Sequence, residues 1–293
     1  MAEGRFLING TQMSAASLAP GLYIVATPIG NLADITLRAL HTLAAADAVA
    51  AEDTRHTGRL LQHYGIRAPL VRYDEHGAAG QRPKLLARLA GGEAVALVSD
   101  AGTPLISDPG FRLVREARDS GHAVHAIPGP SALTAALSVC GLPTDRVLFE
   151  GFLPAKAGAR ARQLNAIAQV QATLALYVAP HRLGDTLAAM AEVLGPREAA
   201  VARELTKRFE TVERGTLPEL AARFAAEPTK GEIVILVAPP SAPALPDVET
   251  LDALLRSALA GQSVSAAAGE VAKATGADRR TLYKRALALK DGA

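Results

Sequence analysis

The chain has little net charge, one cysteine and no long apolar run. Its 293 residues carry a formal net charge of only +2 at pH 7, which excludes a uniformly basic nucleic-acid-binding protein but not a local basic patch. Although 49% of the residues are hydrophobic, no apolar stretch approaches the ~18 residues of a membrane span. Residues 1–20 contain no apolar segment of about 7 to 15 residues, so we expect no secretory signal and a cytoplasmic protein.

The cysteine and histidine content excludes two further kinds of site. Cys140 has no partner for an intrachain disulfide. Its place at the end of an Ala/Leu-rich segment favours buried packing over a redox or nucleophilic role. The seven histidines form neither an H-E-x-x-H motif nor a cluster with carboxylates, so no metal site is expected.

A polar loop follows an apolar run of the kind that fills a buried parallel strand. It reads SDAGTPLISDPG and spans 99–110. Because ligands of open α/β sheets bind outside the carboxyl ends of the strands, we expect Asp100, Gly102 and Thr103 to face a small molecule. The alternative is a plain strand-to-helix connection in which Asp108 caps the next helix.

Two further loops, at 27–31 and 128–131, also follow apolar runs and precede helix patterns. In the second loop, Ser131 is placed to cap the helix that follows. No loop contains Gly-x-Gly-x-x-Gly, and Gly30 alone cannot form that pyrophosphate-binding turn, which argues against an ordinary dinucleotide fold. The loops indicate a compact ligand bound among several strand ends.

The pattern of the whole chain predicts two consecutive α/β domains and a small helical domain. Short apolar runs alternate with amphipathic segments, as in a parallel sheet. The predicted strands are 22–26, 47–51, 69–73, 94–98 and 123–127 in the first domain, and 147–151, 173–178, 199–203 and 232–238 in the second. The predicted parts are a flexible start (1–20), a first α/β domain (21–140), a second (141–238), a Pro-rich linker (239–246) and a helical tail (247–293).

Long ordered strings in these loops and strands resemble a known family. The strings are LYIVATPIGNLADITLRAL at 22–40, AEDTRHTGRLL at 51–61, the loop at 97–110, PGPS at 128–131, GLPTDRVLFEGFLP at 141–154, ARELTK at 202–207 and KGEIVILV at 230–237. They resemble the tetrapyrrole-methylase-like class of S-adenosylmethionine methyltransferases. Within that class they are most similar to the branch that 2'-O-methylates a cytidine of small-subunit ribosomal RNA.

The chain departs from the family pattern at two places. The wider class usually has a Gly-x-Gly-Pro-Gly first loop, where this chain has Thr27 to Asn31. The branch often reads Tyr-Glu-Ser before its His-Arg, whereas Val178 follows Tyr177 here. A role for an acidic side chain at position 178 is therefore not expected.

The resemblance implies that S-adenosylmethionine binds in the cleft between the two α/β domains. The residues that it places around the cofactor are Pro28, Ile29, Asp100, Gly102, Thr103, Pro104, Ser131, Ala132, Tyr177, Leu205, Glu232 and Ile233. Asp100 is the strongest candidate, since a carboxylate can pair with the methionine ammonium or accept hydrogen bonds from ribose hydroxyls. The apolar residues of the set would sandwich the adenine or, alternatively, form ordinary core packing.

A ribose hydroxyl attacks readily only when its proton is removed or its charge is stabilised, so polar residues are expected at the rim of the cleft. The string from Glu52 to His56 offers a carboxylate, a guanidinium and an imidazole just after a strand. His56 is a candidate base and Arg55 a candidate phosphate clamp, and Lys207 is a further candidate. For each of them the alternative is an interdomain network of hydrogen bonds or salt bridges.

The tail predicts a helix-turn-helix. Residues 263–272 are typical of a helix, 275–278 of a turn and 279–290 of a second helix with apolar side chains on one face. The candidate RNA-binding residues are Arg279, Arg280, Lys284 and Arg285. Basic side chains on such a unit suit a phosphate backbone, and they would add affinity and shape recognition more than base reading. The alternative is a solvated helix face.

We therefore expect a cytosolic, homodimeric methyltransferase that acts on small-subunit ribosomal RNA, with the dimer implied by the resemblance alone. Two alternatives remain open. One is methylation of a tetrapyrrole ring carbon, although a porphyrin-sized substrate has no need of the basic tail. The other is a non-enzymatic regulator that binds nucleic acid through the tail and senses a metabolite in the α/β body.

Overall fold

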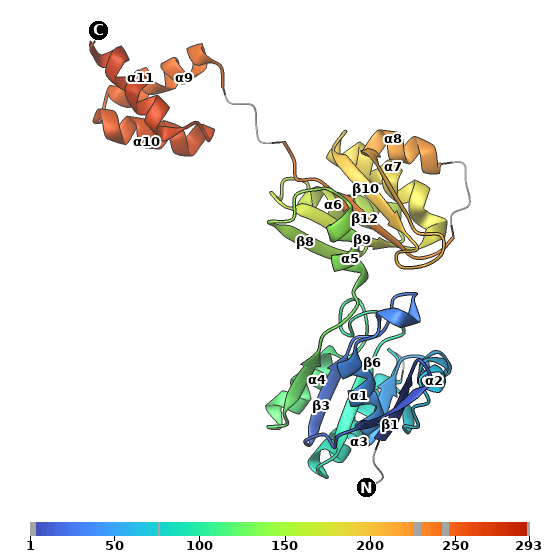
Figure 1. Ribbon diagram of the computed structural model, residues 1–293. Helices are drawn as coiled ribbons and strands as arrows, with labels where there is room; N and C mark the ends of the chain where they lie inside the picture. The colour runs from blue at the N-terminus through green and yellow to red at the C-terminus, as the bar shows by residue number, and fades with distance from the viewer. Residues whose placement is uncertain (1–3, 76, 226–229, 242–245, 292–293) are drawn as a thin grey trace. The chain divides into compact units, whose positions relative to one another are not determined.

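The structure of the protein is a computed structural model, which describes residues 4–75, 77–225, 230–241 and 246–291 (Figure 1). The chain divides into two compact units, Met1–Pro240 and Ser241–Ala293. This division lies inside the linker predicted at 239–246. Within the described ranges, no helix is long and apolar enough to cross a membrane.

The first half of the larger unit is a parallel five-stranded sheet in the order β5-β4-β6-β3-β7. Its strands are β3 (Gly21–Val25), β4 (Ala48–Ala51), β5 (Leu70–Arg72), β6 (Ala94–Val98) and β7 (Val124–Ile127). The predicted strands of the first domain and their parallel arrangement are confirmed. The central strand β6 is buried along its whole length, which explains its uninterrupted apolar sequence.

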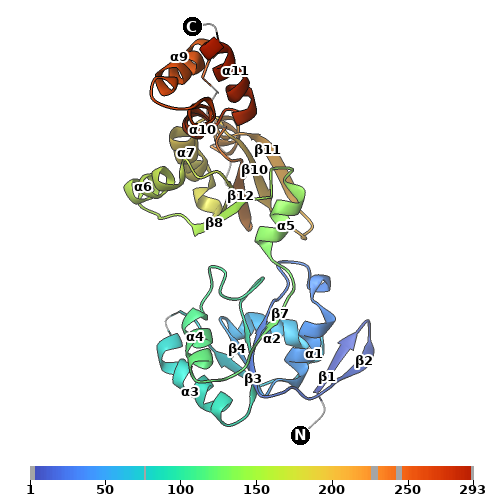
Figure 2. The same cartoon turned by 90° about the vertical axis from the view of Figure 1, so that its left-hand side faces the viewer.

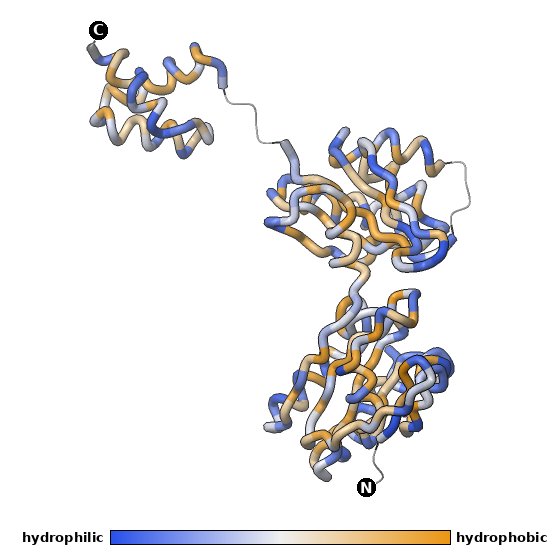
Figure 3. The backbone as a smooth tube through the Cα atoms, viewed as in Figure 1, coloured by the Kyte–Doolittle hydropathy of each residue, from blue (hydrophilic) through white to orange (hydrophobic). Residues whose placement is uncertain are grey.

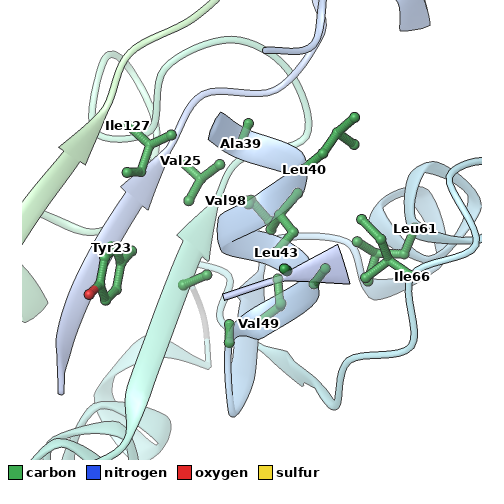
Figure 4. Close-up of a cluster of buried hydrophobic side chains, with 14 of the residues drawn as sticks. Tyr23, Val25, Ala39, Leu40, Leu43, Val49, Leu61, Ile66, Val98 and Ile127 are labelled. Carbon is green, nitrogen blue, oxygen red and sulfur yellow. The ribbon is translucent and has the colours of Figure 1, made fainter. Parts of the chain in front are cut away.

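Helices cover both faces of this first sheet. Its helices are α1 (Leu37–Ala45), α2 (Thr54–His63), α3 (Ala78–Ala90) and α4 (Phe111–Asp119), with a short 3-10 helix η1 (Leu32–Asp34). On one face, Leu43 of α1 and Leu61 of α2 pack with Val49 and Val98 of the strands (Figure 4). α3 and α4 cover the other face through a separate apolar cluster. Figure 3 shows the sheet strands mostly in the orange of hydrophobic residues.

The start of the chain is ordered, so the prediction of a flexible segment over 1–20 is wrong for the described residues. β1 (Gly4–Ile8) and β2 (Thr11–Ala15) pair as an antiparallel hairpin. The turn Asn9-Gly10 has positive φ at both positions, as a two-residue hairpin turn requires. Phe6 is 1% exposed and belongs to the apolar cluster beneath α1. The hairpin is thus anchored to the core by its own apolar side chain.

The second half of the larger unit is a mixed five-stranded sheet in the order β11-β10-β12-β9-β8, in which β8 and β9 are parallel and the other neighbours antiparallel. Its strands are β8 (Val147–Phe152), β9 (Thr173–Val178), β10 (Glu198–Arg203), β11 (Thr211–Thr216) and β12 (Ile233–Val237). Its helices are α6 (Ala157–Ile167), α7 (Leu183–Leu194) and α8 (Leu217–Phe224), with a 3-10 helix η2 (Pro180–Arg182). The sequence did not predict β11, an edge strand with no buried residue.

Helix α5 (Ala132–Val139) packs on the second sheet, although its sequence lies in the domain predicted at 21–140. Ala136 and Cys140 are fully buried and share a core cluster with Ala200 of β10. Small side chains allow the helix to lie close to the strands. The first α/β half therefore ends at β7 and not at residue 140, whereas the predicted buried packing of Cys140 is confirmed.

The smaller unit consists of three helices around a small apolar core (Figure 2). Its helices are α9 (Val248–Leu259), α10 (Val264–Thr275) and α11 (Arg279–Asp291). Leu255, Val271 and Leu282 lie in the core, one from each helix. α10 ends at Gly276, which adopts the left-handed conformation with φ 74° that commonly terminates helices. The predicted helix, turn and helix are therefore present as α10, Gly276 and α11.

Candidate active site

A cavity of about 430 Å³ is lined by the loops that follow β3, β4, β6 and β7 and by residues of β9 and β12. This volume lies within the range of small-molecule sites. Most of the residues that were predicted to surround a cofactor line this cavity. They are Ile29, Asp100, Gly102, Thr103, Ser131, Ala132, Tyr177, Glu232 and Ile233. The three loops selected from the sequence thus meet at one cavity.

Pro28, Pro104 and Leu205 were predicted to contact the cofactor but do not line this cavity. Pro28 lines a smaller neighbouring hollow, and Pro104 is buried within its own loop. Leu205 is 7% exposed and packs with Ala202 in a core cluster. Its packing in this cluster is what the alternative of ordinary core packing predicts.

Hydrogen bonds join the cavity loops to one another. Thr27 and Gly102 form an antiparallel bridge with N···O distances of 2.9 and 3.0 Å. The hydroxyl of Thr103 donates to the carbonyl of Pro130 at 3.2 Å. Gly102 has a φ of +77°, in the left-handed region that favours glycine. The glycine therefore allows the loop to turn while its backbone pairs with Thr27.

The carboxylate of Asp100 lies at the border between the two hollows, since it lines both of them. It accepts a hydrogen bond of 3.0 Å from the backbone N–H of Asp53. Asp53 in turn caps α2, accepting a hydrogen bond of 2.8 Å from the backbone N–H of Arg55 and pairing with its guanidinium at 2.9 Å. The position of Asp100 is thus set by the backbone that follows β4.

The larger cavity is acidic. Glu52, Asp100, Asp108 and Glu232 line it, and among the described residues no Lys or Arg does. Burial and, to a smaller extent, the negative charges of Asp108 and Asp100 together raise the pKa of Glu52 to about 7. In the part of the chain that the structure describes, no group of three His, Cys, Asp or Glu is placed to hold a metal ion. The cavity therefore favours a cationic organic ligand over a phosphate-bearing one.

Asp108 lines this cavity, and the alternative in which it caps the next helix is wrong. α4 begins after Gly110, and no side chain makes a cap hydrogen bond there. Burial raises the pKa of Asp108, a hydrogen bond from Ser99 opposes the rise, and the charge of Asp100 adds to it. Ser131 occupies the cap position of α5 without capping it through its side chain, so that prediction is also wrong. Both residues line the cavity instead.

The aromatic residues Phe152 and Tyr177 line the cavity, and Phe149 packs against Tyr177 without lining it. The rings of Phe149 and Phe152 lie 5.0 and 5.6 Å from the ring of Tyr177, between centroids. Burial raises the pKa of Tyr177, although a hydrogen bond with the backbone of Leu133 opposes the rise. The Tyr177 hydroxyl is therefore neutral at physiological pH. Neutral aromatic rings beside carboxylates suit a ligand that carries both a flat ring and a positive charge.

The three candidate catalytic residues lie outside the larger cavity. The side chain of Arg55 is 87% exposed, and His56 lines the smaller hollow. The ammonium of Lys207 pairs with Glu204 at 2.8 Å and with Glu232 at 3.3 Å. Burial lowers the pKa of Lys207, but the hydrogen bond with Glu204 and the charge of Glu232 outweigh burial and raise it overall. Lys207 is thus a charged ion-pair residue and not a base.

Comparison with known sequences identifies the family of the chain. The family described as Tetrapyrrole (Corrin/Porphyrin) Methylases matches residues 21–221, and the RsmI C-terminal HTH domain matches residues 245–290. The chain belongs to the tetrapyrrole methylase family. Two tetrapyrrole methylase relatives are both named ribosomal RNA small subunit methyltransferase I. The one from Mesorhizobium japonicum is 55% identical and covers 97% of each chain. The one from Pseudomonas aeruginosa is 49% identical and covers 91% of this chain and 96% of its own.

Solved structures share the tetrapyrrole methylase fold. Uroporphyrin-III-C-methyltransferase from Thermus thermophilus is 22% identical with a TM-score of 0.55, covering 75% of this chain and 94% of that one. Diphthine synthase is 18% identical with a TM-score of 0.59, covering 74% of this chain and 89% of that one. These likenesses show the fold alone. Together with the helix-turn-helix match, they confirm the predicted fold class of two α/β domains and a helical tail.

Proposed function

We propose that this protein transfers a methyl group from S-adenosylmethionine to the 2'-hydroxyl of a cytidine in small-subunit ribosomal RNA. The observation that carries the proposal is the similarity of nearly the whole chain to proteins named as ribosomal RNA methyltransferases. Relatives named ribosomal RNA small subunit methyltransferase I are 55% and 49% identical over both the methylase region and the helical tail. The acidic, aromatic cavity of the methylase region supplies the cofactor site that such a reaction needs.

The donor set of the cavity fits S-adenosylmethionine. The cofactor carries a sulfonium and an ammonium, which suit the carboxylates of Glu52, Asp100 and Asp108. Its adenine suits the apolar and aromatic lining, which includes Ile29 and Tyr177. When bound, S-adenosylmethionine supplies a methyl carbon activated by the adjacent sulfonium. These residues would therefore hold the cofactor through charge on one side and through apolar contact on the other.

The contributions of the protein to the reaction are alignment, exclusion of water and acceptance of a proton. The bridge between Thr27 and Gly102 holds the cavity loops in register. Glu52 is the group best matched to accept the hydroxyl proton, because its pKa of about 7 leaves a large fraction ionised at neutral pH. His56 stays the second candidate for this role, because it lines the neighbouring hollow.

The two alternatives are less well supported. The solved tetrapyrrole methyltransferase is only 22% identical, whereas the ribosomal RNA methyltransferase relatives are about half identical and share the tail. A non-enzymatic regulator is disfavoured because the relatives that are about half identical along nearly the whole chain are named methyltransferases. We further propose a cytoplasmic homodimer, supported by family likeness and by a ribosomal RNA substrate. The tail would then add RNA affinity through Arg279, Arg280 and Lys284, which are exposed.

The experiment that tests the function is methyl transfer from tritiated S-adenosylmethionine to purified small ribosomal subunits and to naked ribosomal RNA. Mass spectrometric mapping of ribose methylation, in cells with and without the protein, identifies the nucleotide and the atom together. We expect one 2'-O-methylcytidine of the small subunit to be lost without the protein. Transfer to a base, or to no RNA at all, would contradict the proposal.

A further inference from the structure

A smaller hollow of about 110 Å³ adjoins the acidic cavity and shares Asp100 with it. One wall comes from the loop after β3, with Thr27 and Pro28, and the opposite wall from α2, with His56 and Arg59. The hollow is much smaller than the cavity, so it has room for a single sugar or phosphate group and not for a second cofactor. Because Asp100 separates the two spaces, a group in the hollow lies next to the occupant of the cavity.

The hollow differs from the cavity in having an arginine in its lining. The charged residues that line the cavity are all carboxylates, whereas the hollow is lined by Asp100 from the loop after β6 and by Arg59 and His56 from α2. Asp100 already accepts a hydrogen bond from the backbone of Asp53. Within the described residues, no salt bridge involves Arg59. The positive charge of Arg59 is therefore available to an anion.

The basic side extends along the exposed face of α2. Arg55, Arg59 and His63 are all exposed, and their spacing of four residues places them in one row on a helix. This row leads to the hollow, because Arg59 lines it. Arg55 already pairs with Asp53, so Arg59 supplies the charge for a phosphate, and Arg55 and His63 flank it with exposed N–H donors that can reach the neighbouring backbone.

We infer that the hollow and the row Arg55, Arg59 and His63 bind the ribose-phosphate backbone of the RNA at the nucleotide to be methylated. The inference rests on the proposed function and specifies how that site receives its acceptor. A phosphate belongs on the α2 side, since the Asp100 carboxylate repels it and Arg59 attracts it. The ribose then lies toward Asp100 and the cavity, with its hydroxyl nearer to the methyl donor than the base is. This orientation accounts for modification of the sugar.

The test compares Arg59→Ala with Arg115→Ala in the full-length protein. Arg115 is a matched control because its side chain is 70% exposed on α4, which packs on the opposite face of the sheet. We expect Arg59→Ala to weaken binding of transcribed small-subunit ribosomal RNA about tenfold and to reduce the log-log salt slope by about 0.7. The Michaelis constant for RNA should rise. The affinity for S-adenosylmethionine, measured by calorimetry, should stay within about twofold. Arg59→Lys should restore part of the RNA affinity.

Failure of this inference is distinguishable from failure of the proposed function. If the wild-type protein methylates the RNA and Arg59→Ala leaves RNA affinity and salt slope unchanged, the inference is overturned while the function stands. If Arg59→Ala weakens RNA binding but the wild type transfers no methyl group, the inferred RNA-binding surface is supported and the proposed methyltransferase function is contradicted. A parallel loss of affinity in Arg115→Ala would mean nonspecific charge, which also overturns the inference.

Discussion

The backbone N–H of Asp53 donates a hydrogen bond of 3.0 Å to the carboxylate of Asp100. Asp53 follows β4 and Asp100 follows β6, and these strands are neighbours in the sheet. The bond therefore joins two strand ends that lie far apart in the sequence. It also holds one Asp100 oxygen in place while the residue lines both the acidic cavity and the hollow beside α2.

Loss of this carboxylate should weaken cofactor binding. We predict that Asp100→Ala weakens the binding of S-adenosylmethionine by about 1.5 to 3 kcal/mol, the scale of a hydrogen bond to a charged group. Calorimetric titration measures the change, and the thermal unfolding midpoint checks that the fold is intact. Asp119→Ala, an exposed position on α4, is the control. Unchanged affinity in folded Asp100→Ala would remove Asp100 from the cofactor site.

The raised pKa of Glu52, about 7, makes stability depend on pH. In the unfolded chain this carboxyl has its ordinary pKa of 4.5, so the folded state binds the proton more tightly. The stability that the protonated carboxyl contributes is complete below pH 4.5 and is lost as the pH rises through 7. We predict that Glu52→Gln raises the unfolding temperature relative to the wild type at pH 8, and that the difference disappears near pH 4. Equal differences at both pH values would contradict a raised pKa.

The same carboxyl should couple cofactor binding to proton release. A cationic ligand stabilises the ionised form of Glu52, so binding of S-adenosylmethionine near pH 7 should release a fraction of a proton. Calorimetry in two buffers with different ionisation enthalpies measures this release. In Glu52→Gln the release should disappear, and methyl transfer should fall at least about a hundredfold if Glu52 accepts the hydroxyl proton. Full activity in this variant would assign proton acceptance elsewhere.

Substitution of Gly102 distinguishes the effect of backbone strain on stability from the loss of cofactor binding. Gly102 and Gly92 have φ values of +77° and +81°, so Gly102→Val and Gly92→Val impose a similar backbone penalty of about 1 to 2 kcal/mol. Gly92 lies at the end of α3 with open space around it, whereas Gly102 pairs with Thr27 beside the cavity. We predict that both variants lower the unfolding temperature and that Gly102→Val alone loses S-adenosylmethionine binding. Normal binding by Gly102→Val would contradict the close packing of this loop on the ligand.

The basic residues of the tail should divide into two groups. Arg285 forms a two-point ion pair with Asp252 of α9, so Arg285→Ala should destabilise the three-helix unit and leave the RNA salt slope nearly unchanged. The triple substitution of Arg279, Arg280 and Lys284 by alanine should keep the helices, since alanine has the best helix propensity. It should reduce the salt slope by about 2 if all three residues contact phosphates. Equal slopes of RNA affinity against salt for the wild type and the triple variant would indicate that the tail has a structural role only.

Patterns that extend over a few residues predicted the elements well. The continuous apolar run of β6 and the polar loop after it identified both a central strand and the position of Asp100. The hairpin at the start was missed, although Asn9-Gly10 is a strong hairpin-turn signal in the sequence. β11 was missed too, since an edge strand without buried residues has little apolar signal.

Other features depended on contacts between distant segments. The sequence left open a helix cap at Asp108, which does not form because the loop from 99 to 110 turns through left-handed residues and carries this residue to the cavity. The sequence also did not predict on which sheet α5 packs, because an Ala/Leu-rich helix can bury its side chains against either sheet. Lys207 was a catalytic candidate from its neighbours in sequence, and only its pairing with Glu204 and Glu232 showed an ion-pair role.

The sequence by itself determined the strands of the first sheet and most strands of the second, the loops at their ends and the family resemblance, because periodicity, turn chemistry and long ordered strings act within short segments. Tertiary structure decided which side chains share the cavity and with what charge. Asp108 raises the pKa of Glu52 only because parallel strands bring their carboxyl ends together and the loops after them share a partly buried cavity. Burial and distance set a pKa, and neither is encoded in any short stretch of residues.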